Sequence, residues 1–284
     1  MADSNPLLDF SGLPRFAAIR PEHVTPAVDQ LLAENRALLG RLVQPAVPVT
    51  WEDFVAPLDD ANERLSRAWG AVGHLHSVLD SPELREAYNA NQPKVVQYYT
   101  ELGQNLALFE KFKALRASAG FARLDAAQRR IIDNEIRDFR LSGAELQPAQ
   151  KTRFGELAEA LAGLSTRFSE HILDATNAYA RWVVDEAELS GLPEDVVQAA
   201  REAAGRDGRE GWKLTLRAPC VFPVLQYADN RILREEIYRA YQTRASEFGK
   251  PEWDNTPLIA EILRKRREAA RLLDFVGLSQ WQDA

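Results

Sequence analysis

The sequence contains little sulfur and little histidine. One cysteine, one methionine and four histidines occur among its 284 residues. The single cysteine, Cys220, cannot form a disulfide within the chain, which excludes a fold held by internal disulfides and agrees with a reducing compartment. Residues Met1–Pro6 have neither the basic nor the apolar region of a secretory signal. We therefore expect a cytoplasmic protein.

The chain also lacks an excess of basic charge and long apolar runs. It carries 35 lysines and arginines against 42 aspartates and glutamates, a formal net charge of −7. Holding a polyanion needs a concentrated basic surface, so we expect no nucleic-acid partner. The run Arg264–Arg267 is predicted to be a solvated helix face, because Glu261 and Glu268 can form i,i+4 pairs with it. No apolar stretch approaches a membrane-spanning length, so we expect no membrane partner.

Hydrophobic residues make up 45% of the chain, and in its first two thirds they recur at helical spacing. Helix starts are predicted at Thr25–Pro26, at Ser81–Pro82 and at Thr50, where Asp53 can answer the backbone amide of the cap. Pro93 is predicted to break or kink the next segment, because proline removes an amide donor and clashes with the preceding turn.

The middle of the chain predicts two more helices and then a change of structure. One helix should end at Gly143, and a long one should run from Pro148 to about Asn177. Arg181–Val184 and Trp212–Leu216 are short and rich in β-branched or aromatic residues, which predicts two strands with a helix between them. The fold class expected is mainly α with a small β insertion near residues 181–217.

After an extended stretch expected at Pro219–Pro223, two more helices are predicted, over Ile232–Tyr241 and from Thr256 to about Leu273. The last helix has an apolar stripe, part of which we expect to be exposed. We divide the chain into a helical region at 1–178, a β-containing insertion at 179–228 and a helical segment at 229–284.

Few residues suggest chemistry. His74 and His76 are the closest pair of histidines, but residues two apart on a helix point in different directions and cannot chelate one ion together. His23 and His171 are isolated in sequence. Cys220 has apolar neighbours, which favours a buried structural cysteine over a nucleophile.

Several charged and aromatic residues have both a structural and a functional interpretation. Adjacent acids at Asp59–Asp60 and Glu235–Glu236 diverge on a helix, so we expect solvated faces or i,i+4 pairs. Three arginines could contact carboxylates at a domain interface or on a peptide, and the alternative is local ion pairing with Glu235, Glu236 and Glu247; they are Arg234, Arg239 and Arg244. Tyr238 and Tyr241 could pack within the protein or contact a ligand.

One segment carries a specific resemblance. Asp229–Ser246 repeats charged and aromatic residues in an order similar to that of the thimet oligopeptidase and oligopeptidase A family of zinc metallopeptidases. Other stretches agree with the oligopeptidase A branch: Asn5–Leu8, Ile19–Val24, Ser81–Tyr88, Asp138–Gly143, Asp185–Glu194 and Arg267–Leu273. The likeness covers nearly the whole chain and resembles the N-terminal portion of that family.

The resemblance implies a zinc peptidase whose N-terminal helices form one wall of a channel for short peptides. The family works with a His-Glu-x-x-His helix, and that motif is absent from this sequence. We therefore predict no catalytic, cofactor-binding or metal-binding residue here and no cofactor in this chain, with one zinc ion in the complete family enzyme. This chain is expected to be inactive alone.

The ending departs from the family pattern after Phe275. A truncated gene, a frameshift or a deliberately shortened chain would each give such a tail, and the sequence does not choose among them. Two alternatives to the peptidase portion stay open: a stand-alone helical module that binds peptides or proteins, and a non-functional truncated remnant. The partners considered are short peptides, a second copy, and a catalytic half that associates through the exposed C-terminal helix.

Overall fold

The computed structural model describes residues 5–282. Within that range the chain is mainly helical, with one two-stranded antiparallel sheet, as the sequence predicts. The chain divides into two compact units. Unit 1 comprises Met1–Gly163 and Arg264–Ala284, and unit 2 comprises Leu164–Leu263. The three-part division drawn from the sequence stays a prediction.

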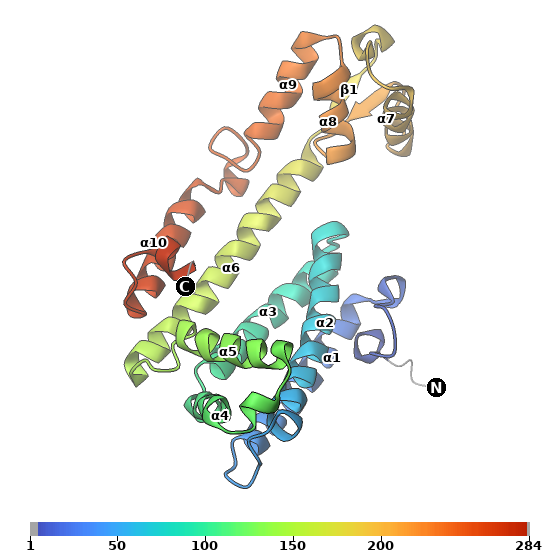
Figure 1. The fold of residues 1–284 in the computed structure, drawn as a ribbon. Helices are drawn as coiled ribbons and strands as arrows, with labels where there is room; N and C mark the ends of the chain where they lie inside the picture. The colour runs from blue at the N-terminus through green and yellow to red at the C-terminus, as the bar shows by residue number, and fades with distance from the viewer. Residues whose placement is uncertain (1–4, 283–284) are drawn as a thin grey trace. The chain divides into compact units, whose positions relative to one another are not determined.

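Unit 1 consists of helices packed around a large hydrophobic core, with a smaller cluster where the start of α6 meets the end of α10. Its helices are α1 (Pro21–Leu42), α2 (Ala56–Val78), α3 (Pro82–Gly103), α4 (Leu106–Ala117), α5 (Ala126–Leu141), the start of α6 (Pro148–Ala178), the end of α10 (Thr256–Leu272) and α11 (Leu278–Gln282). Helix α1 packs on α2 and α3, and α4 packs on α5 (Figure 1). The core is filled by large side chains with almost no exposure, such as Phe54, Leu65, Tyr98 and Phe112.

Short turns complete unit 1. They are η1 (Pro6–Leu8), η2 (Phe16–Ala18), η3 (Trp51–Val55) and η4 (Phe121–Arg123). Several predicted helix ends are confirmed. The hydroxyl of Ser81 accepts the N–H of Leu84 at the start of α3, and Gly143, after the end of α5, has the positive φ of 84° that glycine accommodates without strain.

Two starts in unit 1 differ from the prediction. Helix α1 begins at Pro21, so that Pro26 lies inside it and Thr25 accepts a hydrogen bond from Asn91 at 2.7 Å instead of capping. The burial of Val24 and Leu31 on the same face offsets the one backbone bond that Pro26 removes.

At η3 the predicted cap is present, but its partner differs. Thr50 Oγ1 accepts the N–H of Asp53 at 3.0 Å. The carboxylate of Asp53 accepts the Thr50 hydroxyl at 2.9 Å, so the acid answers the hydroxyl and not the backbone amide that the sequence pattern suggested.

Pro93 does not break its helix. Helix α3 continues through it to Gly103. Buried side chains on both sides, Leu84 before the proline and Val95 and Tyr98 after it, pack into the core and hold the two halves in one helix. The pattern starts again only at α4, where Asn105 accepts the N–H of Leu108.

Unit 2 combines helices with the sheet. It contains the rest of α6, β1 (Arg181–Val183), η5 (Glu186–Leu189), α7 (Glu194–Arg206), β2 (Trp212–Leu214), α8 (Ala218–Tyr227), α9 (Arg231–Gln242), η6 (Pro251–Trp253) and the start of α10. The two strands are antiparallel, with Trp182 opposite Lys213, which confirms both predicted strands. Helix α7 packs on β2 and α8 packs on α9 (Figure 1).

The stretch Pro219–Pro223 was predicted to be extended and is helical. It forms the first part of α8. Pro219 lies in the first turn, where backbone amides have no partner within the helix. Val221 and Val224 are both 0% exposed and lie three residues apart on one face, so packing decides the helix in spite of Pro223.

Helix α10 has the exposed apolar residues that its pattern predicts. Ile259 and Leu263 are 47% and 56% exposed, whereas Ala269 and Ala270 are buried. No helix among residues 5–282 is both long enough and apolar enough to cross a membrane.

Candidate functional site: a cationic cavity in unit 2

His23 and His74 have structural partners in unit 1. His23 Nδ1 accepts the backbone N–H of Arg20 at 3.1 Å and so caps the start of α1. The His74 ring lies against Phe16, with ring centroids 5.2 Å apart. Both contacts are of the packing and capping kind that isolated histidines commonly make.

His76 and His171 are likewise held by neighbours. The His76 ring stacks on Tyr88 at 4.2 Å, and its Nε2 lies 3.4 Å from a carboxylate oxygen of Asp80. In unit 2, His171 Nδ1 lies 2.9 Å from the side-chain oxygen of Asn255. Asn255 donates from its own nitrogen to the backbone oxygen of Phe168 at 3.0 Å, so its oxygen is the acceptor and His171 carries the proton on Nδ1.

These histidines do not form a zinc site. A catalytic zinc ion needs three protein ligands around one point, and nowhere in the described range 5–282 do three histidine, cysteine, aspartate or glutamate side chains gather in that way. The residues present therefore do not fit the zinc ion that the family resemblance implies, and no catalytic step can be assigned to this chain through that metal.

Asp59 lies near a half-buried carboxyl group that the sequence gave no reason to single out. Glu135 of α5 lines a small cavity with Asp59, Asn62 and Phe139. Partial burial, together with the negative charges of Asp138 and Asp59, raises the pKa of Glu135 to about 7. Ionisation of this group is therefore less favourable in the folded chain than in water.

Three arginines in and just after α9 have different kinds of partner. Arg239 pairs with Glu235 one turn away at 3.2 Å, as local pairing predicts. Arg234 differs from the prediction, because it donates to backbone oxygens of Ala228 and Asp229. Arg244, just after the helix, also differs and lies 3.7 Å from the ring centroid of Tyr241.

The acids and tyrosines of this segment also separate. Glu236 pairs with Arg181 of β1 at 3.0 Å and so ties the sheet to α9. Glu247 accepts the hydroxyl of Thr256. Tyr241 packs on Phe222 with ring centroids 5.7 Å apart, whereas Tyr238 is 55% exposed. Tyr238 is thus the tyrosine of this helix that is available for contacts with another molecule.

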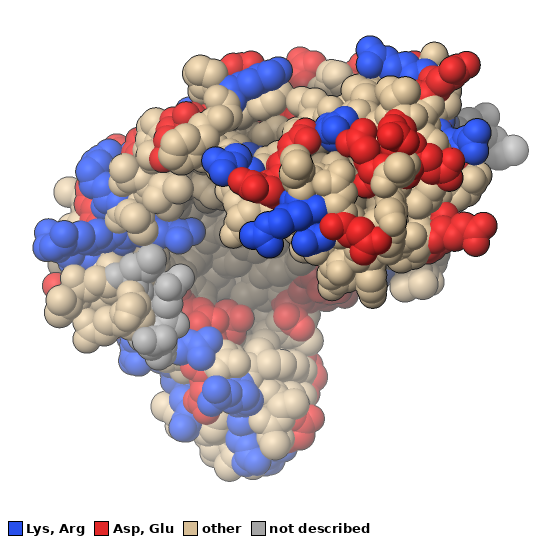
Figure 2. All heavy atoms as spheres, turned by 90° about the horizontal axis from the view of Figure 1, so that it is seen from above, with Lys and Arg blue, Asp and Glu red and all other residues tan. Residues whose placement is uncertain are grey.

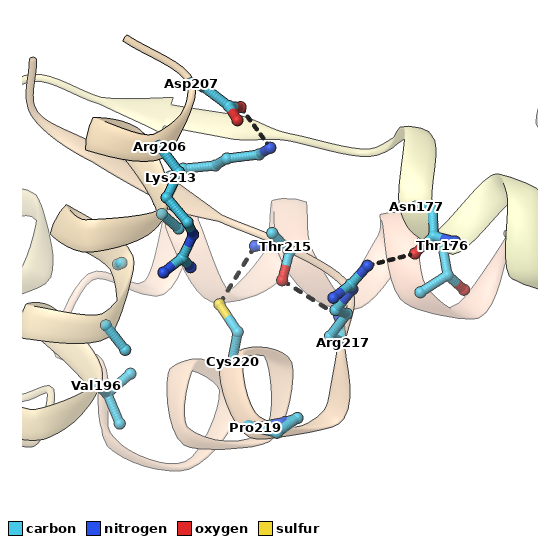
Figure 3. Close-up of a pocket in the computed structure, with 13 residues that line it drawn as sticks. Thr176, Asn177, Val196, Arg206, Asp207, Lys213, Thr215, Arg217, Pro219 and Cys220 are labelled. Carbon is cyan, nitrogen blue, oxygen red and sulfur yellow. Dashed lines mark hydrogen bonds and ion pairs between the residues drawn. The ribbon is translucent and has the colours of Figure 1, made fainter. Parts of the chain in front are cut away.

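Unit 2 has a cavity of about 330 Å³, open to solvent on one side, between α6, α7, β2 and α8 (Figure 3). One wall is the face of α7 that carries small apolar side chains: Val196, Ala199, Ala200 and Ala203. The remaining lining comes from Thr176 and Asn177 of α6, Lys213 and Thr215 around β2, and Arg217, Pro219 and Cys220 at the start of α8, with Arg206 and Asp207 at the end of α7.

Positive charge dominates this cavity. Lys213 Nζ contacts Asp207 at 2.6 Å, so that cation is neutralised by a carboxylate. Arg217 donates at 3.0 Å to the side-chain oxygen of Asn177, which is uncharged. Figure 3 shows the guanidinium of Arg206 pointing into the cavity toward Cys220. With three cations and one acid, the lining carries a formal charge of +2.

Cys220 is half-buried and lines this cavity, so the prediction of a buried cysteine is corrected. Its Sγ accepts the backbone N–H of Thr215 at 3.3 Å. The extended reading of Pro219–Pro223 misplaced this residue, because helix α8 turns the thiol back toward the end of β2.

Sequence reasoning missed the cavity because its lining comes from four separate elements. Arg206 and Arg217 are eleven positions apart and belong to no recognised motif. One signal was available in α7, where alanines precede the final Arg206. Small side chains on a helix face leave space beside it, and the arginine places a positive charge next to that space.

A second cavity of about 230 Å³ lies elsewhere in unit 2, beside the ends of α6 and α9. Its lining includes Arg244, Lys250 and Trp253, and the ammonium of Lys250 lies 4.4 Å from the Trp253 ring centroid. Both basic side chains are therefore engaged with aromatic rings.

Comparison with known families assigns two parts of the chain. Residues 28–151 match the family Neurolysin/Thimet oligopeptidase, N-terminal domain. Residues 224–282 match Peptidase family M3, and this match runs past Phe275, where the sequence analysis expected the resemblance to end.

Curated proteins similar to the chain carry one recurring name. Oligopeptidase A of Haemophilus influenzae is 46% identical over 278 residues, which are 97% of this chain and 40% of that protein. Oligopeptidase A of Escherichia coli is 44% identical over 274 residues, 96% of this chain and 40% of that protein. The "Probable cytosolic oligopeptidase A" of Arabidopsis thaliana is 38% identical over 279 residues, 96% of this chain and 39% of that protein.

The chain thus spans about 40% of the length of these relatives. The family match at residues 28–151 is to an N-terminal domain, and the alignments with the relatives extend over almost all of the 284 residues. The chain belongs to the oligopeptidase A and thimet oligopeptidase family, peptidase family M3, and corresponds to the N-terminal part of its members.

Proposed function

We propose that this chain is the non-catalytic N-terminal portion of an oligopeptidase A-like zinc metallopeptidase that hydrolyses short peptides. In this role its helices form one wall of the channel that admits the peptide, and a part outside these 284 residues supplies the zinc site. The chain by itself is then inactive.

One observation carries the proposal: the chain aligns with oligopeptidase A over 97% of its own length but only 40% of the relative, while the described residues 5–282 contain no set of zinc ligands. A zinc peptidase activates a water molecule on the metal and needs a general base beside it. The histidines of unit 1 and unit 2 are instead engaged in caps, ring contacts and hydrogen bonds.

The test is a cleavage assay with a short fluorogenic peptide in the presence of zinc. The purified 284-residue chain is expected to give no hydrolysis above the buffer rate, with the oligopeptidase A of Escherichia coli as the active control. Turnover by the pure chain that a chelator abolishes would contradict the proposal.

The exposed apolar residues of α10 favour an association role. Ile259 and Leu263 lie one turn apart on the same face and are both about half exposed. We propose that this face contacts the catalytic part of a family member, because contiguous exposed apolar side chains mark interaction surfaces. A second copy of the chain is the alternative occupant.

Light scattering with a C-terminal fragment of a relative tests this surface. The chain is expected to form a one-to-one complex, and Leu263→Glu should abolish it. Leu79→Glu, at a 72% exposed position in unit 1, is the matched control and should leave the complex intact. If the chain alone forms a homodimer that Leu263→Glu dissociates, the partner of this face is a second copy of the chain and not the catalytic part.

The same proposal includes a cytoplasmic location and no nucleic-acid partner. One relative is named a probable cytosolic oligopeptidase A, which supports the location. On the face displayed in Figure 2, lysine and arginine side chains are interleaved with aspartate and glutamate, an arrangement unlike the continuous basic surface of a nucleic-acid-binding protein. Retention of the chain on immobilised DNA at physiological salt would count against this part of the proposal.

A further inference from the structure

We propose that the 330 Å³ cavity of unit 2 binds the C-terminal carboxylate of a short peptide that ends in a small apolar residue. The inference concerns binding by this chain alone and requires no hydrolysis, so it stands apart from the peptidase proposal. It rests on three features of the cavity: its unbalanced positive charge, its apolar wall and its size.

The charge comes first. Arg206 makes no hydrogen bond or ion pair with any other residue in the range 5–282, and it points into the cavity (Figure 3). Arg217 has only a neutral amide oxygen as its side-chain partner, that of Asn177. Two guanidinium groups without a carboxylate on one cavity favour an anion, and their planar fork suits a carboxylate.

The apolar wall then selects among anions. Val196, Ala200 and Ala203 lie on one face of α7 and line the cavity together with Pro219. A bare phosphate ion would leave this wall in contact with water. A carboxylate attached to a small apolar group satisfies the arginines and covers the wall at the same time.

The size limits the ligand. A volume of about 330 Å³ lies at the small end of the range for ligand sites, so the cavity holds the last one or two residues of a peptide and not a longer segment. The chain end of a peptide supplies the carboxylate beside such a residue, and its preceding part can leave through the open side of the cavity toward solvent.

Titration calorimetry at low ionic strength tests the inference on the full chain. N-acetyl-Ala-Ala is expected to bind with a dissociation constant of about 1 mM, the affinity typical of a ligand of this size. Its C-terminal amide should bind at least tenfold more weakly. Inorganic phosphate and free alanine should also bind more weakly, which separates a peptide end from a free anion or a free amino acid.

Two variants remove the charge, and a third removes the space. Arg206→Gln and Arg217→Gln should each weaken binding about tenfold, the effect of losing one charge-assisted hydrogen bond. Ala203→Leu should block binding with every cation in place. Arg201→Gln, at an exposed position of the same helix outside the cavity, is the control and should bind like the parent. Circular dichroism checks that each variant is folded.

Several results would overturn the inference. Equal binding of the acid and the amide would exclude carboxylate recognition. Equal or tighter binding of phosphate would mean a general anion site, and equal or tighter binding of free alanine would mean an amino-acid site. Unchanged affinity in folded Arg206→Gln and Arg217→Gln, or no binding of N-acetyl-Ala-Ala at 20-fold the expected dissociation constant, would remove the cavity as a peptide-end site.

Discussion

Unit 1 and unit 2 differ in the space between their elements and in the charge that lines it. In unit 1, three polar side chains are joined inside the core: Asn35 donates to the hydroxyl of Tyr98 at 3.3 Å, and that hydroxyl donates to Asn62 at 2.7 Å. The cavities described there measure about 10 and 30 Å³. In unit 2 the corresponding volumes are about 330 and 230 Å³, and both cavities are lined by basic side chains.

The difference suggests different roles for the two units. A large core with only small cavities provides a rigid scaffold. A smaller core around a two-stranded sheet leaves room between elements, and charge placed in that room can hold a ligand. Unit 1 is thus the candidate for the structural role and unit 2 for recognition.

The largest expected effect is in the core of unit 1. Phe112 is 1% exposed and packs against Phe54 and Phe139, with ring centroids 4.9 and 5.6 Å apart. Phe112→Ala should lower the free energy of unfolding by about 3–5 kcal/mol, because it removes buried surface and leaves a cavity. Urea denaturation measures the loss, and hydrogen exchange should rise first in unit 1.

The matched control for this core variant is Leu106→Ala at the start of α4. Leu106 is 50% exposed, so its replacement by alanine should lower the free energy of unfolding only slightly. If Phe112→Ala raised exchange equally in both units, the two would unfold together and the distinction between them would apply to structure but not to stability.

A glycine in unit 2 should have the next largest effect. Gly211 has a positive φ of 89°, and an added Cβ would lie 2.3 Å from the backbone oxygen of Val183 on the paired strand. Gly211→Ala should destabilise the sheet by about 2–4 kcal/mol through the clash and the strained backbone together. The measurement is hydrogen exchange at β1 and β2.

Gly208→Ala separates these two causes. Gly208 also has a positive φ, but an added Cβ would meet no atom within 4 Å. Gly208→Ala should therefore lower the free energy of unfolding by about 1 kcal/mol, through the backbone strain alone. Equal losses in the two variants would show that the close approach to Val183 contributes nothing.

The amide of Asn255 gives a smaller effect. This residue is 2% exposed and joins α6 to the start of α10 through His171 and the backbone oxygen of Phe168. Asn255→Ala should lower the free energy of unfolding by about 1–3 kcal/mol, because two partly buried polar groups lose their partner. Exchange should rise in unit 2 and remain unchanged around α1 in unit 1, and the opposite pattern would contradict the assignment of this contact to unit 2.

The smallest effect is a pH dependence in unit 1. Glu135 has a pKa raised to about 7 by burial and by nearby acids, so the folded state holds its proton more tightly than the unfolded state. Stability from this group is present at low pH and is lost as the pH rises through 7. The free energy of unfolding of Glu135→Gln, relative to that of the parent, should therefore rise by about 1–2 kcal/mol when the pH is raised from 5 to 8.

Urea denaturation of both proteins at the two pH values measures this gain. Glu86→Gln, on the exposed face of α3, is the control and should keep the same difference from the parent at both pH values. A constant difference for Glu135→Gln as well would mean that its carboxyl group is solvated in the folded chain.

Local sequence signals predicted the elements that depend on local chemistry. Ser81 caps a helix where a short polar side chain precedes a periodic apolar pattern. The strands at β1 and β2 followed from β-branched and aromatic residues. Three predictions at prolines were wrong: the helix start at Thr25–Pro26, the break at Pro93 and the extended stretch at Pro219–Pro223. In each case, buried side chains near the proline contribute more than one lost backbone bond.

The sequence by itself determined the helical class, the small sheet and the family, because periodicity, turn residues and segment similarity are properties of consecutive residues. The tertiary structure alone decided where the charges meet: Arg206 and Arg217 face one cavity, and Glu135 lies beside Asp59. Side chains from separate helices come together only when those helices pack. The partial burial that raises the pKa of Glu135 likewise exists only after packing has excluded water.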